Sequence, residues 1–234
     1  MIQTTFVISF VLLSFSFIIF FKLTSLEIKS KISISFSFDS FYDENRMGVS
    51  HLRVINEDVV APKMGFATHG HQDMEILTYV LDGELAHRDS LGNGSTIRAG
   101  EIQRMTAGTG IRHSEMNPCG YASVHFLQIW ILPDCHGLQP SYEQKNLPAG
   151  IGADRFSLIA GPIGGSHAVT LHQDVNVWLS TPKGGGRVDV AIEPGRVGYL
   201  HIAKGRVRAS ERILEGGDGL AFKIGEVTQI ETME

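Results

Sequence analysis

Two short histidine-containing segments constrain the fold of this 234-residue chain more than any other feature. One segment reads THGHQDME and contains His69 and His71; the other reads IRHSEMNP and contains His113 and Glu115. In a β-strand, residues i and i+2 point to the same face with Cα atoms about 6.6 Å apart. On an α-helix such residues diverge, and helical metal sites use i, i+4 spacing instead. The spacing therefore predicts two strands that present three histidines and one glutamate to a common interior.

The composition excludes some classes of function. The formal net charge is −5 and no Lys/Arg-rich run occurs, so nothing in the chain predicts direct binding to nucleic acid. The 26 glycines suggest many tight turns between short strands. Cys119 and Cys135 are too few for a disulfide framework, which favours free thiols in a reducing compartment.

The N-terminus carries an apolar segment that has two interpretations. Residues 1–21 contain no charged side chain, and as a helix they would span about 31 Å, which matches a bilayer core. A membrane anchor with the following domain in the cytoplasm fits the lysines that come after the run, whereas a secretory signal lacks its basic start and cleavage site. A mispredicted start codon explains the segment equally well. We expect a cytoplasmic protein, either free or anchored through these residues.

From residue 31 onward the chain alternates apolar and polar residues, as half-buried strands do. Further short runs are separated by glycine, asparagine, aspartate or proline, and this cadence predicts an all-β protein. We predict an apolar N-terminal segment at 1–30, a metal-binding domain at 31–133, a polar linker at 134–150 and a second β-domain without a metal site at 151–234. Gly108 and Gly110 are expected to form a tight turn just before His113.

Several longer stretches resemble the pirin family of the cupin superfamily, in particular its bacterial quercetin 2,3-dioxygenase branch. They include GFATHGHQDMEILTYVLDGELAHRDSLGN, AGEIQRMTAGTGIRHSEMNP, LQIWILP and PSYEQK, and the resemblance is close over about residues 34–180. It implies a bicupin, that is, two β-barrel domains. It also implies that the first barrel binds a non-haem metal, usually iron, through His69, His71, His113 and Glu115.

Glu75 matches the position that supplies an acidic ligand in many other cupins. Because Glu115 is the glutamate of the pirin motif, we expect Glu75 to support the ligands without binding the metal. His87 is expected to be a packed or surface histidine, and Phe66 and Trp130 to be packing residues of the barrel. The alternative for the four ligand residues themselves is a polar pocket that holds no metal.

The donor set suits one divalent transition metal, with Fe(II) implied by the resemblance and Cu, Ni, Co or Zn also compatible. The implied reaction is cleavage of a flavonol by O2 with release of a depside and carbon monoxide, and Glu115 would accept the flavonol hydroxyl proton as a general base. A second reading is an iron-binding regulatory protein that acts through protein partners as a transcriptional cofactor or redox sensor. A third is a structural or storage cupin. Fold alone does not separate them.

Overall fold

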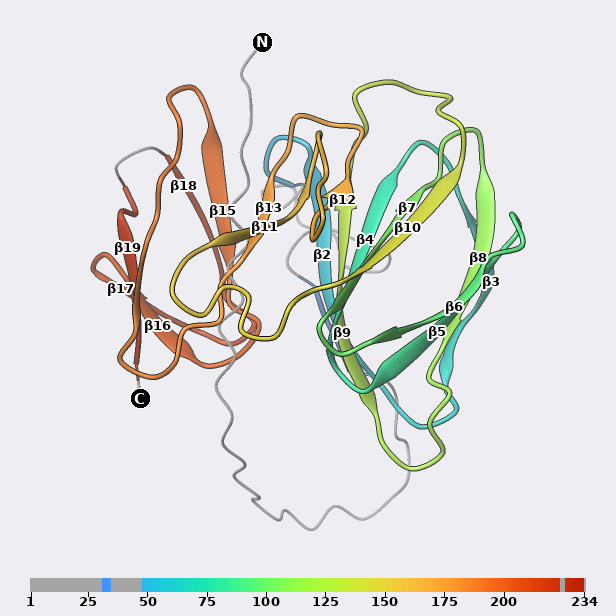
Figure 1. Ribbon diagram of the computed structural model, residues 1–234, viewed down its shortest axis with the longest axis horizontal. Helices are drawn as coiled ribbons and strands as arrows, with labels where there is room; N and C mark the ends of the chain where they lie inside the picture. The colour runs from blue at the N-terminus through green and yellow to red at the C-terminus, as the bar shows by residue number, and fades with distance from the viewer. Residues whose placement is uncertain (1–30, 35–47, 224–225, 234) are drawn as a thin grey trace.

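The computed structural model describes residues 31–34, 48–223 and 226–233, and all regular elements within these ranges are β-strands. The strands of the first half are β1 (Lys31–Ile34), β2 (Leu52–Val60), β3 (Gly65–His71), β4 (Glu75–Asp82), β5 (Glu84–Asp89), β6 (Gly94–Arg98), β7 (Glu101–Thr106), β8 (Ile111–Met116), β9 (Val124–Ile131) and β10 (Ser141–Asn146). The strands of the second half are β11 (Ser157–Gly161), β12 (Val169–Thr170), β13 (Val177–Leu179), β14 (Arg187–Asp189), β15 (Val197–His201), β16 (Arg206–Ala209), β17 (Arg212–Glu215), β18 (Gly219–Lys223) and β19 (Gln229–Thr232). The expected all-β architecture with two β-domains is confirmed (Figure 1).

Two antiparallel sheets build the first domain. One has the strand order β1-β2-β9-β4-β7-β10 and the other the order β3-β8-β5-β6. They enclose an apolar cluster to which both contribute, with Val80 and Phe126 from the larger sheet and Leu85 and Ile97 from the smaller one. The domain is thus a closed two-sheet barrel with an interior of its own.

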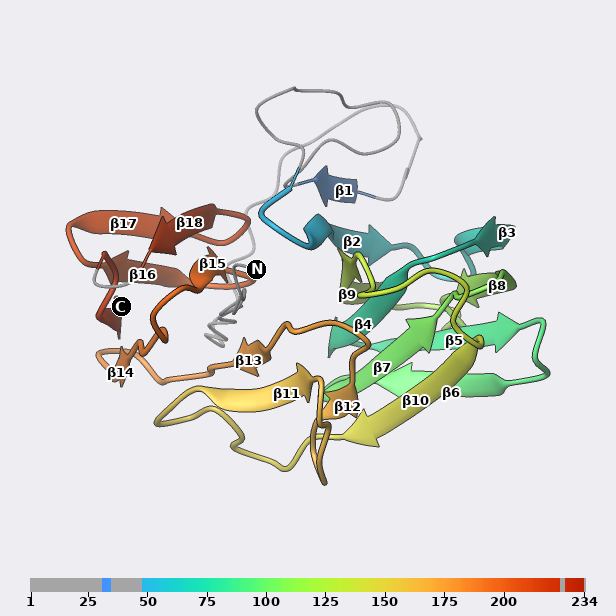
Figure 2. The ribbon, with the colours of Figure 1, turned by 90° about the horizontal axis from the view of Figure 1, so that it is seen from above.

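The second domain consists of three smaller sheets, with the strand orders β12-β11-β13, β14-β19-β16-β17 and β15-β18. Its own core includes Leu200, Val207, Phe222 and Ile230. Figure 2 shows β11, β12 and β13 beside the first domain, with the remaining strands of this half farther away. Among the described residues, the two groups of potential metal ligands lie in the first domain.

The largest apolar cluster joins the two domains across the outer face of the six-stranded sheet. Leu77 and Ile129 of this sheet belong to the same cluster as Ile159 and Val177 of the second domain. Because the opposite face of the sheet lines the barrel, β4 is buried on both faces except at Asp82. This explains why its sequence is a nearly continuous apolar run instead of an alternating one.

The segment at 134–150, which we predicted to be a linker, instead contributes a strand to the first domain. β10 pairs with β7 over its whole length, at the edge of the six-stranded sheet. Its residues SYEQKN are polar and mostly half-buried, so the strand lacks the apolar alternation that reveals strands in a sequence.

The apolar segment at 1–30 lies outside the described residues. Within the part of the chain that the structure describes, no helix has the length and apolar character needed to cross a membrane. Cys119 and Cys135 are both free, as expected.

The predicted turn before β8 is present, and its two glycines serve it in different ways. Gly108 has φ 47° and Gly110 has φ 135°, a range that disfavours residues with a Cβ. A Cβ on Gly108 would lie 1.9 Å from the Leu138 carbonyl oxygen, whereas one on Gly110 would meet nothing within 4 Å. The Leu138 oxygen accepts a hydrogen bond from the Thr109 amide at 2.9 Å, which holds it in place.

Gly108→Val should therefore prevent folding or lower the yield of folded protein severely, because it adds a backbone clash to backbone strain. Gly110→Val should cost only the strain, about 1–2 kcal/mol. Thermal unfolding and soluble yield measure both effects. Equal damage by the two substitutions would contradict the assignment of the clash to Gly108.

A half-buried carboxylate, that of Glu57, and two histidines connect the two domains at the outer face of the six-stranded sheet. The Glu57 carboxylate accepts a hydrogen bond from His125 Nε2 at 2.8 Å, and its other oxygen lies 3.6 Å from His201 Nε2 of the second domain. Burial alone would raise the pKa of Glu57, but the hydrogen bonds and positive charges of His125 and His201 outweigh it and lower the pKa to about 2.

Because this folded-state pKa lies below the ordinary value of 4.5, ionised Glu57 stabilises the fold above pH 4.5, and this contribution is lost as the pH falls toward 2. Glu57→Gln should lower the melting temperature at pH 6 by about 2–8 °C, from a loss of about 1–2 kcal/mol. The difference from wild type should shrink below pH 4.5. Thermal unfolding across pH tests this, with the exposed Glu211→Gln as control; a pH-independent difference would contradict it.

Candidate metal centre

The pairing of β3 with β8 brings the two histidine-containing segments together. His69 lies opposite His113, and Phe66 lies opposite Glu115. Between these pairs β3 has one residue more than β8, so the register shifts there as in a β-bulge. In a regular strand, residues three apart such as Phe66 and His69 point to opposite faces, but the bulge lets both face the barrel interior.

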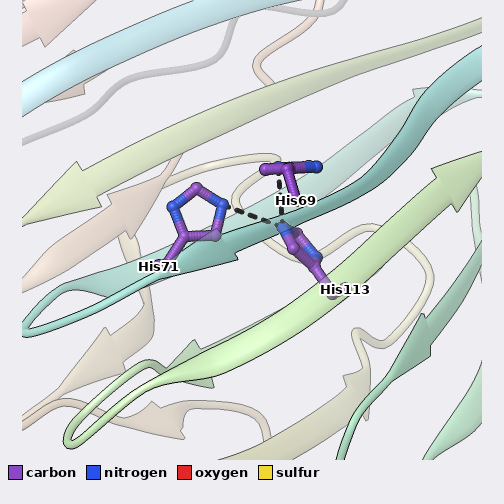
Figure 3. A group of neighbouring side chains, drawn as sticks. All are labelled: His69, His71 and His113. Atoms are coloured by element: carbon purple, nitrogen blue, oxygen red, sulfur yellow. Dashed lines mark hydrogen bonds between the residues drawn. The ribbon is translucent and has the colours of Figure 1, made fainter.

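Three imidazoles converge at this point (Figure 3). His113 Nε2 lies 3.0 Å from His71 Nε2 and 3.1 Å from His69 Nε2. The ligand atoms of the three histidines all lie within 4.8 Å of one another. His113 is buried and the other two are half-buried, so the cluster sits at the edge of the interior.

The protonation of the cluster leaves nitrogen lone pairs free for a metal. Burial, followed by the charges of the neighbouring histidines, lowers the pKa of His113 to about 3. Burial, followed by the charge of His69, lowers the pKa of His71 to about 4. Both rings are therefore neutral at physiological pH. His69 Nδ1 donates to the Ala67 carbonyl oxygen at 2.8 Å, which fixes the ring with its Nε2 toward His113.

The spacing of these atoms also fits a metal. Two nitrogens bound about 2.1 Å from one ion at a right angle are about 3.0 Å apart. The observed separations of 3.0 and 3.1 Å, which are also those of N–H···N hydrogen bonds between the rings, match this arrangement. The three histidines thus fit one divalent transition metal held by imidazole donors.

Glu115 lies beside the histidines, fully buried, and forms a group of potential ligands with His113 and His87. Its Oε2 accepts a hydrogen bond from Gln128 Nε2 at 2.6 Å, and its Oε1 has no hydrogen-bond partner among the described residues. Burial raises the pKa of Glu115 to about 7; the Gln128 hydrogen bond opposes this rise and the charge of Asp58 adds to it. One buried oxygen is therefore available to a metal or to a substrate.

His87 is a packed histidine, as expected. It contacts His113 on the Nδ1 side of the ring, opposite the Nε2 atom that faces His69 and His71. It is fully buried on β5, with its Nδ1 3.5 Å from His113 Nδ1 and its Nε2 3.3 Å from Asp89 Oδ2. Asp89 is fixed by hydrogen bonds from the amides of Leu91 and Asn93 at 2.9 and 3.0 Å. This chain of contacts orients the ring of His113 so that Nε2 faces the cluster. The sequence analysis did not predict this contact of His87 and Asp89 with His113, although the sequence shows that His87 and Asp89 are two residues apart and so share a strand face.

Glu75, which we expected to support the ligands, lies elsewhere. It is fully buried at the start of β4, and its Oε2 accepts a hydrogen bond from the His172 amide at 3.1 Å and lies 3.2 Å from His172 Nδ1. It thus shares a face with Leu77, on the side of the sheet that meets the second domain. The barrel-facing position next to it on β4 belongs to Ile76.

The cluster opens on a cavity of about 430 Å³ inside the first domain, a size typical of ligand sites. His69, His71 and Glu115 line it together with Phe66 and Trp130. The Trp130 ring meets the His71 ring edge-on, with centroids 4.8 Å apart. The two aromatic residues, which we expected to be packing residues, thus pack against the barrel interior and also form a wall of the cavity.

Loss of the His87 ring should weaken metal binding, because His113 Nδ1 would lose its neighbour and the ring its orientation. We expect His87→Leu to raise the dissociation constant for Ni(II) about 10- to 100-fold. A titration with a competing chelator measures this, with His136→Leu as control, since the side chain of His136 is 89% exposed. An unchanged dissociation constant in His87→Leu would show that His113 is oriented without His87.

Comparison with known proteins agrees with this architecture. Residues 22–131 match the Pirin family, and residues 158–234 match the Quercetinase C-terminal cupin domain family. The chain is 43% identical over 203 residues to a putative quercetin 2,3-dioxygenase of Pasteurella multocida, covering 86% of this chain and 85% of that protein. It is 43% identical over 190 residues to the quercetin 2,3-dioxygenase of Escherichia coli strain K12, covering 80% of each.

A solved structure is similar over nearly the whole length. The bacterial pirin YhhW from Escherichia coli, in complex with nickel(II), superposes with a TM-score of 0.81 at 38% identity and covers 89% of each chain. Both domains of the present chain thus have counterparts in one known protein. Together with the two family matches, this similarity shows that the chain belongs to the pirin family of bicupin proteins.

Proposed function

We propose that this protein is a metal-dependent dioxygenase that cleaves a flavonol such as quercetin with O2. The observation that carries the proposal is the convergence of three histidines beside an aromatic-lined cavity, with two of them, His69 and His71, on its wall. The names of two relatives support it, because proteins 43% identical to this chain are called putative quercetin 2,3-dioxygenase and quercetin 2,3-dioxygenase.

His69, His71 and His113 would hold the metal, with the free Oε1 of Glu115 as the fourth protein donor. We propose Fe(II) as the metal; Ni(II), which is bound in the structure of the Escherichia coli relative, as well as Cu, Co and Zn, suits the same donors. When bound, the metal supplies a Lewis acid that lowers the pKa of the flavonol 3-hydroxyl and activates the ring toward dioxygen.

The side chains of the cavity would handle the proton and position the substrate. Oε1 of Glu115 would leave the metal and then accept the 3-hydroxyl proton as a general base; burial first, then the charge of Asp58, raises the pKa of this carboxyl to about 7. Gln128 holds the other oxygen and so fixes the direction of the carboxylate. Phe66 and Trp130 offer ring faces and edges to a planar aromatic molecule.

The overall reaction balances as flavonol plus O2 giving a depside plus carbon monoxide. Both atoms of O2 enter the depside, and the carbon that carries the 3-hydroxyl leaves with its oxygen as carbon monoxide. No further reductant or oxidant is required.

We place the protein in the cytoplasm, where free thiols persist. Cys119 is half-buried and Cys135 is exposed, and both are unpaired in the structure. Disulfides form and persist in oxidising compartments, so exposed free cysteines are more compatible with a reducing one.

The proposal is tested with the full chain, loaded anaerobically with Fe(II) and then given quercetin and O2. Wild-type protein should consume oxygen and release carbon monoxide in equal amounts, and His69→Ala should do neither because it loses a ligand. Glu115→Gln should retain metal but lower turnover at least about 100-fold, because the general base is gone. Glu193→Gln, whose side chain is 82% exposed, is the control.

Unchanged turnover in Glu115→Gln with normal metal content would contradict the role of Glu115. Metal-loaded wild-type protein that consumes no oxygen would contradict the enzymatic proposal itself. That result would favour the alternative of an iron-binding regulatory protein that acts through protein partners.

A further inference from the structure

The cavity beside the three histidines has a polar wall that neither the metal ligands nor the proposed general base accounts for. Asn56 and Asp58 of β2 line it and are 5% and 2% exposed. They are two residues apart on the strand, so they share a face, and their cross-strand partners on β9 are Gln128 and the fully buried Phe126. Both side chains therefore point into the barrel.

These two side chains carry buried oxygens without partners. Asn56 Oδ1 and Asp58 Oδ1 have no hydrogen-bond partner among the described residues, and the same is true of Glu115 Oε1 in this cavity. Buried polar atoms are almost always paired, because leaving one unpaired destabilises the fold. The amide oxygen accepts hydrogen bonds and so do the two carboxyl oxygens when ionised, so a hydroxyl group, which both donates and accepts, suits each of the three.

The neighbouring side chain that could supply a donor is already engaged. Gln128 lies opposite Asn56, but its amide nitrogen donates to Glu115 and its amide oxygen accepts from Trp130 Nε1 at 3.1 Å. Turning the amide toward Asn56 or Asp58 would break both bonds. Thr78 and Gln103 also carry buried donors without partners, but neither lines the cavity, so a molecule in the cavity is the donor that reaches Asn56 and Asp58 most directly.

The aromatic wall of the cavity further restricts the kind of ligand that fits beside the polar wall. Phe66 and Trp130 are apolar and aromatic, and they line the same cavity as the oxygens of Asn56 and Asp58. A flat aromatic molecule that carries hydroxyl groups on its rim matches both walls at once.

We propose that Asn56 and Asp58 form a subsite that binds hydroxyl groups of the substrate distant from the hydroxyl at the histidines. The protein thereby selects polyhydroxylated aromatic substrates over those with a single hydroxyl. This inference rests on the proposed use of the cavity for a flavonol and specifies which flavonols it prefers.

The test compares two probes in anaerobic binding to the full, Ni(II)-loaded chain, without turnover. Quercetin carries hydroxyl groups on several ring positions, whereas 3-hydroxyflavone carries only the one expected at the metal. Wild-type protein should bind quercetin at least about tenfold more tightly, as one or two added hydrogen bonds predict.

Asn56→Leu and Asp58→Leu should each reduce this preference about tenfold, and Asn56→Leu should change the dissociation constant of 3-hydroxyflavone less than about twofold. Asp58→Asn retains an acceptor oxygen at the same place and should keep the preference. A preference for quercetin that survives in both leucine variants would overturn the subsite.

Thermal unfolding separates this role from a structural one. Because each leucine replaces an unpartnered buried polar group with an apolar group of similar size, both leucine variants should melt no lower than wild type. Lower melting temperatures together with equal losses for both probes would show that the residues support the fold, and would overturn the subsite.

The remaining outcomes separate this inference from the proposed function. Wild-type protein that binds both probes equally would overturn the subsite and leave a flavonol site in place. Wild-type protein that binds neither probe would overturn the proposed function and this inference with it.

Discussion

The pairing of His69 with His113 across β3 and β8 is the contact on which the site depends. A shift of this register by one residue would turn the ligands of one strand to the outside of the barrel. Two local features hold the register and the rings in place. The bulge in β3 supplies the Ala67 carbonyl that accepts from His69, and the glycine turn at Gly108 sets where β8 begins. The metal-binding geometry is thus a property of two strands and the turns that align them.

The six-stranded sheet serves a different purpose on each face. Its outer face is apolar and packs against the second domain, which explains why a chain with one candidate metal centre retains two β-domains. Its inner face carries a row of buried polar residues at matching register, formed by Asn56, Gln128, Thr78 and Gln103. Such a row weakens the barrel interior as a hydrophobic core. A row of buried polar residues is expected where the barrel interior binds a polar ligand, since functional sites often lower the stability of the fold.

Much of this could be predicted from the sequence, because the strongest signals were local. The i, i+2 spacing of the ligands placed them on strands, and Gly108 and Gly110 marked the turn before β8, where both have positive φ. Pairing between distant strands could not be read in the same way. The polar edge strand β10 was therefore predicted as linker, because an edge strand that is half-exposed has no apolar alternation.

The roles of buried polar residues were the least predictable part of the site. Glu75 was expected near the histidines because of its position in a sequence motif. Successive residues of a strand face opposite sides of the sheet, and Glu75 lies on the side that meets the second domain, where it accepts a hydrogen bond from the His172 amide. His87, in contrast, has no ligand spacing of its own and becomes meaningful only because β5 pairs with β8. Parity within a strand can be estimated from a sequence, whereas the identity of the strand opposite depends on the whole fold.

The most direct test of the account is X-ray absorption spectroscopy of the full chain loaded with one equivalent of Ni(II) or Fe(II). The account predicts a first coordination shell of nitrogen and oxygen at about 2.1 Å with the multiple-scattering signature of three imidazoles, falling to two in His69→Ala. A wild-type spectrum with fewer than three imidazoles, or one unaffected by His69→Ala, would contradict the convergence of His69, His71 and His113 on one metal.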